Sequence, residues 1–269
     1  MVLDRAPATS RRSAPHPVLR VLGYYLLAWR RMWRGTLFAH FGAPLLFLGA
    51  IGYGLGSLVD GAGSTPLGVP FVQFIAPGVL AATAMQTGVM ESTYPVLGAI
   101  KWQRNYHAML ATPLSSDHVV LGHLASIVLR CVVGSGVFLA VATLLGAVPS
   151  GWGVLAVPVA ALVALAHGAP VYLLATRVES DVAFALVFRL VLTPLFLFSG
   201  TFFPTSQLPD WLEPAAWLTP LWHGVELARA ATLGRIEIWP TLGHLAYLLL
   251  WCVVGVLLAC RGLRRRMVV

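Results

Sequence analysis

Long apolar runs separated by short polar segments dominate the chain, and they predict six membrane-spanning helices. A helix needs about 20 mostly apolar residues to cross the hydrocarbon core of a bilayer. The predicted spans are Leu37–Val59, Phe71–Glu91, His118–Gly146, Trp152–Thr176, Val182–Phe203 and Pro240–Cys260. Pro77 predicts a kink in the second span, and Ser115 or Ser116 is expected to cap the third. The pattern therefore predicts an all-α polytopic membrane protein with its six-span domain over residues 37–269.

Two different segments precede the first span. Residues 1–16 are polar and contain several arginines and prolines, which predicts a disordered cytoplasmic tail. From Pro17 to Arg34, apolar residues recur at helical spacing and arginines gather near the end. This pattern is typical of an amphipathic helix that lies in the membrane interface with its arginines at the headgroups. We assign residues 17–36 to this interfacial helix; a positively charged flank of the first span is the alternative.

The segment between the second and third spans, residues 94–117, predicts a short amphipathic helix. Trp102, Tyr106 and Met109 or Leu110 are spaced at i, i+4 and i+7 or i+8, which places them on one helical face. Pro113 ends the helix, because the residue before a proline is pushed out of the helical region. Such a helix could dock a soluble partner. A loop lying on the surface fits the pattern equally well.

The stretch Ser199–Gly234, between the fifth and sixth spans, is too broken by proline to cross a bilayer and too apolar for an ordinary loop. It predicts two short helices: one starts near residues 208–211, and the other has Thr219 as N-cap and ends at Gly234. Its tryptophans are typical of a membrane interface, and Glu226 and Arg229 are spaced to pair. We expect a re-entrant external hairpin over residues 204–239, with gate residues Pro204, Pro209, Trp211, Pro220, His223, Glu226 and Arg229.

Composition and charge support a membrane protein and orient it. Only 10% of the 269 residues are charged and 58% are hydrophobic, against about 25% charged in soluble domains. With the N-terminus inside, the cytoplasmic segments carry seven arginines before the first span, then Lys101, Arg104, Arg177, Arg261, Arg264, Arg265 and Arg266. The external segments carry only Arg229 and Arg235. The positive-inside rule thus predicts that both termini are cytoplasmic. The net charge of +8 reflects this topology, so we expect no nucleic-acid partner.

Enzyme and cofactor motifs are absent from the sequence. No H-E-x-x-H pair occurs, and the single lysine, Lys101, follows Ile100, so the chain lacks the G-K-[ST] of a phosphate-binding loop. Three cysteines, Cys131, Cys252 and Cys260, lie in apolar runs and are expected to behave as small apolar residues. We therefore expect no metal, cofactor or catalytic residue in this chain. One lysine among eighteen basic residues, with abundant alanine, glycine and valine, is typical of a GC-rich bacterial genome, which favours a bacterial cytoplasmic (inner) membrane.

Ionisable groups within spans are candidates for a substrate path, because they are costly in lipid. Arg130 lies about a dozen residues into the third span and Glu91 ends the second, so a pairing between them is one hypothesis. Arg189 is expected to snorkel toward the cytoplasm. Gln86 and His167 either join neighbouring helices by hydrogen bonds or line a cavity.

Two motifs carry a resemblance to a known family. The segment ESTYP…WQRNYHAMLATPLSSDHVVLGHL resembles the intracellular coupling region of ABC-2-type exporter permeases. The segment FLFSGTFFPTSQLP…PAAWLTPLWHGVELARAATLG is similar to their C-terminal signature. With six spans, the resemblance covers nearly the whole chain, and the nodulation lipooligosaccharide and daunorubicin-type exporter permeases are the nearest subgroup.

The resemblance implies a permease that dimerises and binds two separate ABC ATPase subunits, which hold the ATP and magnesium. It places a coupling helix within Tyr94–Thr112, and makes residues 17–34 the connecting helix. The coupling residues would be Lys101, Trp102, Arg104, Tyr106, Met109 and Leu110. His123 in LGHL stands where relatives often carry an acidic residue, so a charge contact with the ATPase at that position stays open.

The expected function is therefore the membrane subunit of an ATP-driven exporter of an amphipathic or lipid-linked substrate, such as a glycolipid, a lipooligosaccharide or a hydrophobic drug. An intramembrane lipid-modifying enzyme is the alternative, and its polar set would be Asp210, Glu213, His223, Glu226 and Arg229. A membrane anchor for a partner complex is a third hypothesis. The sequence leaves the cargo open, and homodimer and heterodimer equally so.

Overall fold

The computed structural model describes residues 16–37, 42–63 and 68–267, and these ranges contain no strand. The α-helices are α1 (Pro17–Leu37), α2 (Ala43–Phe47), α3 (Gly56–Gly61), α4 (Phe71–Ser92), α5 (Tyr94–Lys101), α6 (Asn105–Leu110), α7 (Ser116–Leu144), α8 (Ala156–Arg177), α9 (Val182–Val187), α10 (Thr193–Phe198), α11 (Glu213–Trp217), α12 (Pro220–Leu233) and α13 (Ile238–Met267). Two π-helical segments, η2 (Leu48–Leu55) and η5 (Phe188–Leu192), join α2 to α3 and α9 to α10. The expected all-α fold is thus found, whereas most of the predicted disordered tail lies outside the described residues.

Four helical segments are long and apolar enough to cross a membrane. They are Phe71–Lys101, Ser116–Leu144, Gly151–Arg177 and Ile238–Met267. At the predicted first and fifth spans, the described residues form the shorter apolar helices Leu45–Gly61 and Val182–Phe198. Each is a few residues short of the about 20 that a span requires. The structure therefore supports four spans by length, and the full count of six stays a prediction.

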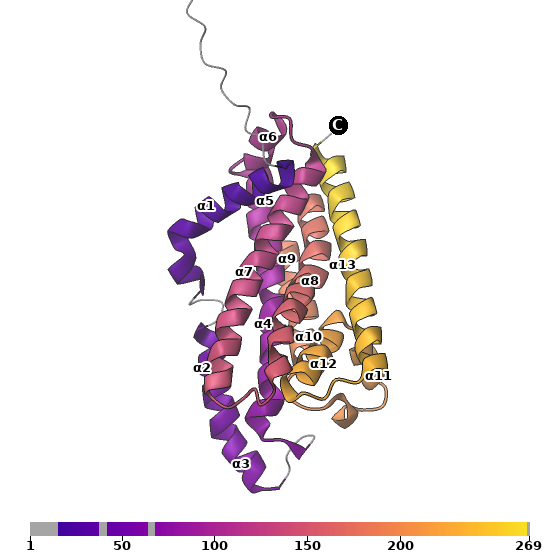
Figure 1. Cartoon of the computed structure of the whole chain (residues 1–269). Helices are drawn as coiled ribbons and strands as arrows, with labels where there is room; N and C mark the ends of the chain where they lie inside the picture. Colours follow the sequence, from indigo (N-terminus) through magenta and orange to yellow (C-terminus); the bar gives the residue numbers. More distant parts are fainter. Residues whose placement is uncertain (1–15, 38–41, 64–67, 268–269) are drawn as a thin grey trace, which may run out of the picture.

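The long helices run side by side in an elongated bundle (Figure 1). The most buried of them is α4, which packs against α7, α8 and α12. It crosses α8 at small residues: a Cβ atom added to Gly88 would lie 2.1 Å from the carbonyl oxygen of Ala164. Small residues permit such close backbone contact in membrane bundles. At this crossing the backbones of α4 and α8 are therefore in close contact.

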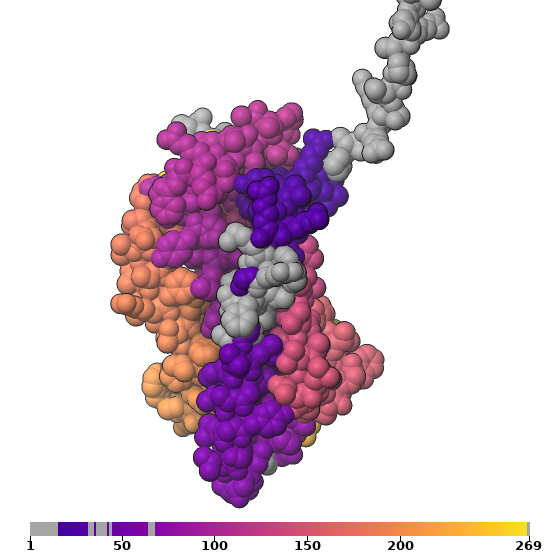
Figure 2. All heavy atoms as spheres, turned by 90° about the vertical axis from the view of Figure 1, so that its left-hand side faces the viewer, coloured from indigo at the N-terminus to yellow at the C-terminus, as the bar shows by residue number. Residues whose placement is uncertain are grey.

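One end of the bundle, the α6 end, carries α5, α6 and the C-terminal part of α13 (Figure 1). The expectation of one continuous coupling helix is wrong, because residues 102–104 separate α5 from α6. Arg104 has a φ of 53°, a left-handed conformation that a continuous right-handed helix excludes. At the same end α1 lies on α7, where Val21 packs directly on Gly122. Figure 2 shows α1 covering this face beside the α5–α6 segment.

The opposite end, the α12 end, contains the segment between α10 and α13. Thr219 caps α12 by accepting a hydrogen bond from the backbone of Trp222, and Gly234 ends the helix with a φ of 70°, as predicted. The first hairpin helix begins later than predicted, at Glu213 with Pro214 in its first turn. The prolines explain the shift, because Pro214 suits a first turn whereas Pro209 precedes a non-helical turn. Since α12 packs against α4, α8 and α13, the hairpin is built into the bundle.

Candidate functional site

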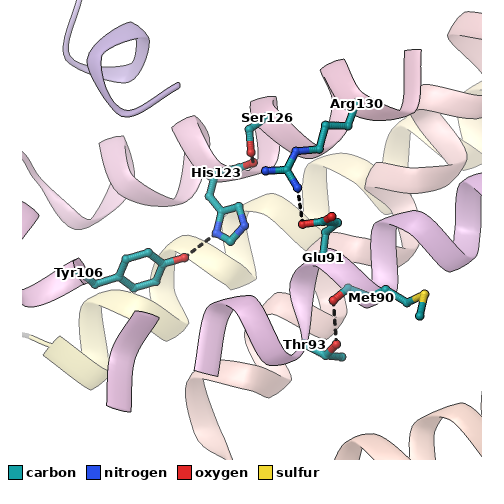
Figure 3. Close-up of polar contacts among 7 residues, drawn as sticks. All are labelled: Met90, Glu91, Thr93, Tyr106, His123, Ser126 and Arg130. Atoms are coloured by element: carbon teal, nitrogen blue, oxygen red, sulfur yellow. Dashed lines mark hydrogen bonds and ion pairs between the residues drawn. The ribbon is translucent and has the colours of Figure 1, made fainter. Parts of the chain in front are cut away.

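Three buried side chains from three helices form a hydrogen-bonded chain at the α6 end. The hydroxyl of Tyr106 in α6 lies 2.5 Å from Nδ1 of His123 in α7, and Figure 3 shows the two side chains pointing toward each other. Tyr172 in α8 donates to the Tyr106 hydroxyl at 2.8 Å. Tyr106 therefore donates its own proton to His123, which accepts it on Nδ1. The chain connects α6 to two of the long helices.

A fourth ring attaches α1 to the same chain. Tyr25 stacks on the ring of His123, with centroids 4.4 Å apart and an interplanar angle of 18°. Burial raises the pKa of both Tyr25 and Tyr106 above the ordinary tyrosine value, because a phenolate loses its hydration inside a protein. Both hydroxyls thus keep their protons. We refer to Tyr25, Tyr106, His123 and Tyr172 together as the tyrosine network.

The predicted pairing of Arg130 with Glu91 is confirmed. Arg130 Nη1 in α7 lies 2.7 Å from Glu91 Oε2 in α4, and the two side chains are 16% and 14% exposed. Figure 3 shows this pair close to His123, which lies on the same helix, α7, as Arg130. Seven residues, about two helical turns, separate His123 from Arg130. The tyrosine network and the ion pair therefore form one polar band across α1, α4, α6, α7 and α8.

A surface cluster joins three further segments at the α6 end. Lys101, the last residue of α5, pairs with Glu179 at 2.5 Å, and Arg266 near the end of α13 pairs with the same carboxylate. Hydrogen bonds from Arg266 and then from Lys101 lower the pKa of Glu179 to about 2. Lys101, predicted as a contact for the ATPase, is thus engaged within the chain.

The predicted coupling residues separate into a surface group and a buried one. Trp102 is 66% exposed, and Arg104 is exposed beside it in the turn between α5 and α6. The expectation that Tyr106 shares a helical face with Trp102 is wrong, since the side chain of Tyr106 is 0% exposed and that of Trp102 is 66% exposed. The break at Arg104 explains the difference, because helical spacing counted from Trp102 does not continue past it. Met109 and Leu110 are partly buried against the core.

A groove runs between α1 and α6 next to this turn. Its volume is about 310 Å³, at the lower end of the usual range for small-molecule pockets. It is lined by Arg20, Val21, Tyr24, Asn105, Ala108, Met109, Thr112 and Leu114. His123 does not line this groove and is 2% exposed. Direct contact between His123 and a docked partner is therefore excluded in this conformation.

The remaining intramembrane candidates lie apart from one another. Gln86 is exposed on a side of α4 different from that of Glu91. His167 is buried in α8, where Nδ1 contacts the carbonyl of Val163 at 2.8 Å. Arg189 is exposed within η5. The structure thus brings Arg130 and Glu91 together and leaves the other three separate.

At the α12 end, the predicted Glu226–Arg229 pair is confirmed at 2.6 Å. Arg229 is buried; it donates to the carbonyl of Gly200 at 2.6 Å, and its guanidinium lies 4.2 Å from the ring centroid of Phe74. His223 lies 2.7 Å from His244, Nδ1 to Nδ1. Burial, and then the neighbouring His244, lower the pKa of His223 to about 4.

The other predicted gate residues occupy varied positions at this end. Pro220 opens α12, Pro204 lines a pocket beside Glu226 and Arg229, and Pro209 and Trp211 are exposed. The polar set of the enzyme alternative is divided, because Glu213, Glu226 and Arg229 line that pocket whereas Asp210 and His223 do not. A gating role for these residues stays a prediction.

Several residues of the site were missed from the sequence. Tyr172 and Tyr25 complete the tyrosine network, and His244 is the partner of His223. The sequence feature that could have identified them is a tyrosine or histidine within an otherwise apolar run, because a buried polar side chain needs a hydrogen-bonding partner. Within the part of the chain that the structure describes, no group of three or more histidine, cysteine, aspartate or glutamate side chains could hold a metal ion.

Comparison with known proteins finds one family over most of the chain. The sequence profile of the family described as ABC-2 type transporter matches residues 21–233. Nodulation protein J of Rhizobium leguminosarum bv. trifolii is 32% identical over 241 residues, which cover 90% of each chain. The protein of the same name from R. leguminosarum bv. viciae is 31% identical over 244 residues, 90% of this chain and 91% of the relative. That from Bradyrhizobium diazoefficiens is 30% identical over 209 residues, 78% of each chain.

Proposed function

The chain belongs to the ABC-2 type transporter family, and from this premise we propose that it is the permease subunit of an ATP-driven exporter. It is a multi-pass membrane transport protein, and relatives named nodulation protein J match it over most of its length. In the proposed complex, two copies of an ABC ATPase bind ATP and magnesium, and a second permease copy completes the path. The cargo is amphipathic or lipid-linked, and moves from the cytoplasm or inner leaflet outward.

The distribution of charge supports the orientation. The α6 end carries Lys101, Arg177 and the arginines at residues 264–266, whereas the α12 end carries fewer basic residues. Basic residues accumulate on the cytoplasmic side of membrane proteins. We therefore place the α6 end in the cytoplasm, with both termini inside a bacterial inner membrane, and take residues 45–61 and 182–198 as the remaining two spans.

The tyrosine network is the observation that carries the proposal. An ATPase that engages the exposed turn at Trp102 would move α6, and α6 is joined through Tyr106 to α7 and α8. A satisfied buried network resists internal rearrangement because an unpaired polar group in the interior costs about 1–3 kcal/mol. A displacement of the Trp102 turn would thus move α7 and α8 together with α6, because the hydrogen bonds of the network hold the three helices together.

Replacement of Trp102 by alanine tests the docking step. In a purified permease–ATPase complex, we expect ATP turnover to fall at least threefold or the ATPase to dissociate, since exposed tryptophans anchor many interfaces. Trp239→Ala is the matched control, because that side chain is 84% exposed and lies in the first turn of α13, at the end of the bundle opposite α6. Equal turnover and equal ATPase content in both variants would refute the docking role of the turn.

A further inference from the structure

An apolar pocket lies between α8 and the segment formed by α9, η5 and α10. Its volume is about 180 Å³, and α4, α12 and α13 each contribute one residue to its wall. The described residues that line it are valines, leucines, prolines, an alanine and a tryptophan, together with a single histidine, His167. An apolar cavity of about 150 Å³ in another protein holds one benzene ring. The pocket is therefore large enough for one aromatic ring.

The pocket has a buried inner wall and an exposed rim. Val89 of α4 and Ala166 of α8 are each 1% exposed, and Leu192 of η5 is also buried. Val191 and Trp251, by contrast, are 48% and 37% exposed and form the rim. A ligand can therefore enter from the side of the bundle, and the buried inner wall leaves it no passage through the bundle.

The wall formed by α9, η5 and α10 differs from the long helices in its winding and its packing. The π-helical segment η5 supplies Val191 and Leu192, and short π-helical segments within α-helices often occur at functional sites. Among the described residues, α9, η5 and α10 contact the long helices much less than α4 and α8 contact each other. A ligand in the pocket would fill space between this weakly packed segment and α8.

His167 has an unused hydrogen-bond acceptor. The residue is 8% exposed, and its Nδ1 lies 2.8 Å from the carbonyl oxygen of Val163, one turn earlier in α8. A carbonyl oxygen only accepts, and a charged imidazolium is costly inside a membrane bundle, so Nδ1 carries the hydrogen and Nε2 a lone pair. Nε2 is buried and has no partner among the described residues. Because an unpaired buried acceptor is unfavourable, Nε2 is suited to a ligand that donates a hydrogen bond.

The lining restricts the charge and the polarity of the ligand. No acidic or basic residue is among the described residues that line the pocket, so a charged ligand would be desolvated without a counter-ion. Ethers and ketones carry acceptors only and cannot pair with the lone pair of Nε2. A buried water typically makes about three hydrogen bonds, which this largely apolar lining does not supply. An aromatic ring that carries one hydroxyl meets both requirements.

We infer that this pocket binds a small neutral phenol. The aromatic ring lies between Leu192 and Trp251, and the hydroxyl donates to Nε2 of His167. Because the terminal torsion of a histidine side chain is broad, a modest turn of the ring brings the buried Nε2 to the pocket wall. The bound phenol holds η5 against α8. The inference does not rest on the proposed export function, and the buried inner wall distinguishes this ligand from a transported cargo.

Photoaffinity labelling with para-(trifluoromethyldiazirinyl)phenol tests the inference. The purified chain is placed in lipid nanodiscs without its ATPase, and mass spectrometry locates the labelled residues. We expect saturable labelling at the rim, on Val191 or Trp251, that para-ethylphenol suppresses by competition. Its methyl ether, para-ethylanisole, has the same ring but no donor, and it should compete roughly tenfold more weakly, the loss of one hydrogen bond.

Variants of the histidine separate its hydrogen bond from its shape. His167→Phe keeps a ring and removes the acceptor, so para-ethylphenol should compete roughly tenfold more weakly than in wild type. His167→Gln keeps an acceptor, and the change should be less than about threefold. His107→Phe is the matched control, because this exposed histidine of α6 does not line the pocket, and it should behave like wild type.

A variant at the rim tests the pocket without altering its buried wall. Val191→Trp should block entry and remove the saturable labelling of Trp251, because Val191 is at the exposed rim. Equal competition by para-ethylphenol in wild type and His167→Phe would overturn the assignment. So would labelling that does not saturate, or that Val191→Trp leaves unchanged, since the probe would then only be dissolved in the lipid. Because no ATPase is present, either result leaves the Trp102 test of the proposed function unaffected.

Discussion

At the scale of single residues, the buried ion pair between Glu91 and Arg130 shows how charge is tolerated inside this bundle. Each side chain is mostly removed from solvent, and the two atoms are 2.7 Å apart. Desolvation makes a buried pair costly to form, so it adds little net stability, whereas loss of one partner leaves an uncompensated charge. The pair therefore constrains α4 against α7 more than it stabilises the fold.

Removal of one partner should be far more harmful than removal of both. We expect Glu91→Ala to lower the free energy of unfolding by about 3–5 kcal/mol, and the double variant Glu91→Leu/Arg130→Met to recover most of that loss. Chemical denaturation in nanodiscs measures both values. Arg264→Ala, which breaks a more exposed pair with Asp117, should cost at most about 1 kcal/mol. A double variant as unstable as Glu91→Ala would contradict this account.

At the scale of helices, the α5–α6 segment shows what periodicity can and cannot predict. The sequence predicted the segment, its amphipathic character and its end before Pro113. It did not predict the break at Arg104 or the burial of Tyr106. Whether a single non-glycine residue adopts the left-handed conformation depends on tertiary packing, which helical spacing does not describe. Tyr106 is held by His123 and Tyr172, 17 and 66 residues away in the chain. Contacts between residues so far apart in the sequence produce no periodic pattern within the α5–α6 segment, so its spacing does not predict them.

The attachment of α5 to the end of α13 should depend on pH. Ion pairing lowers the pKa of Glu179 from 4.5 to about 2. Its contribution to stability is therefore complete above pH 4.5 and is lost as the pH falls through about 2. The thermal stability of wild type should exceed that of Glu179→Gln near neutral pH, and the difference should shrink between pH 4.5 and 2. A difference that stays constant over this range would show that Lys101 and Arg266 do not act through the carboxylate.

At the scale of the whole molecule, hydropathy predicted the long helices well. The helices α4, α7 and α8 match the predicted spans with small shifts at their ends, whereas α13 continues to Met267, beyond the predicted end at Cys260. At the predicted first and fifth spans, the described residues form shorter apolar helices that contain the π-helical segments η2 and η5. Pro194, in the first turn of α10, has no backbone donor, and the carbonyl of Phe188 in η5 accepts from both the backbone N–H and the hydroxyl of Thr193. Hydropathy counts apolar residues and does not detect such local changes of winding.

In the exporter that we propose, ATP-driven movement of the Trp102 turn would pass through the tyrosine network to α7 and α8. Tyr106→Phe isolates this step, because it removes the hydroxyl that links His123 to Tyr172 while the ring still fills the core. The Trp102 surface is unchanged in that variant, so the ATPase should still bind and turn over ATP. Only the response of the membrane helices should be weakened.

The most direct measurement is the distance between the two copies of Leu144, labelled as Leu144→Cys, in the permease–ATPase complex by pulsed electron paramagnetic resonance. Leu144 is exposed at the end of α7 remote from α6. We expect ATP with magnesium to shift this distance in otherwise wild-type protein, and Tyr106→Phe to reduce the shift by at least half. A distance that ATP leaves unchanged, or a shift of equal size in both proteins, would contradict the account.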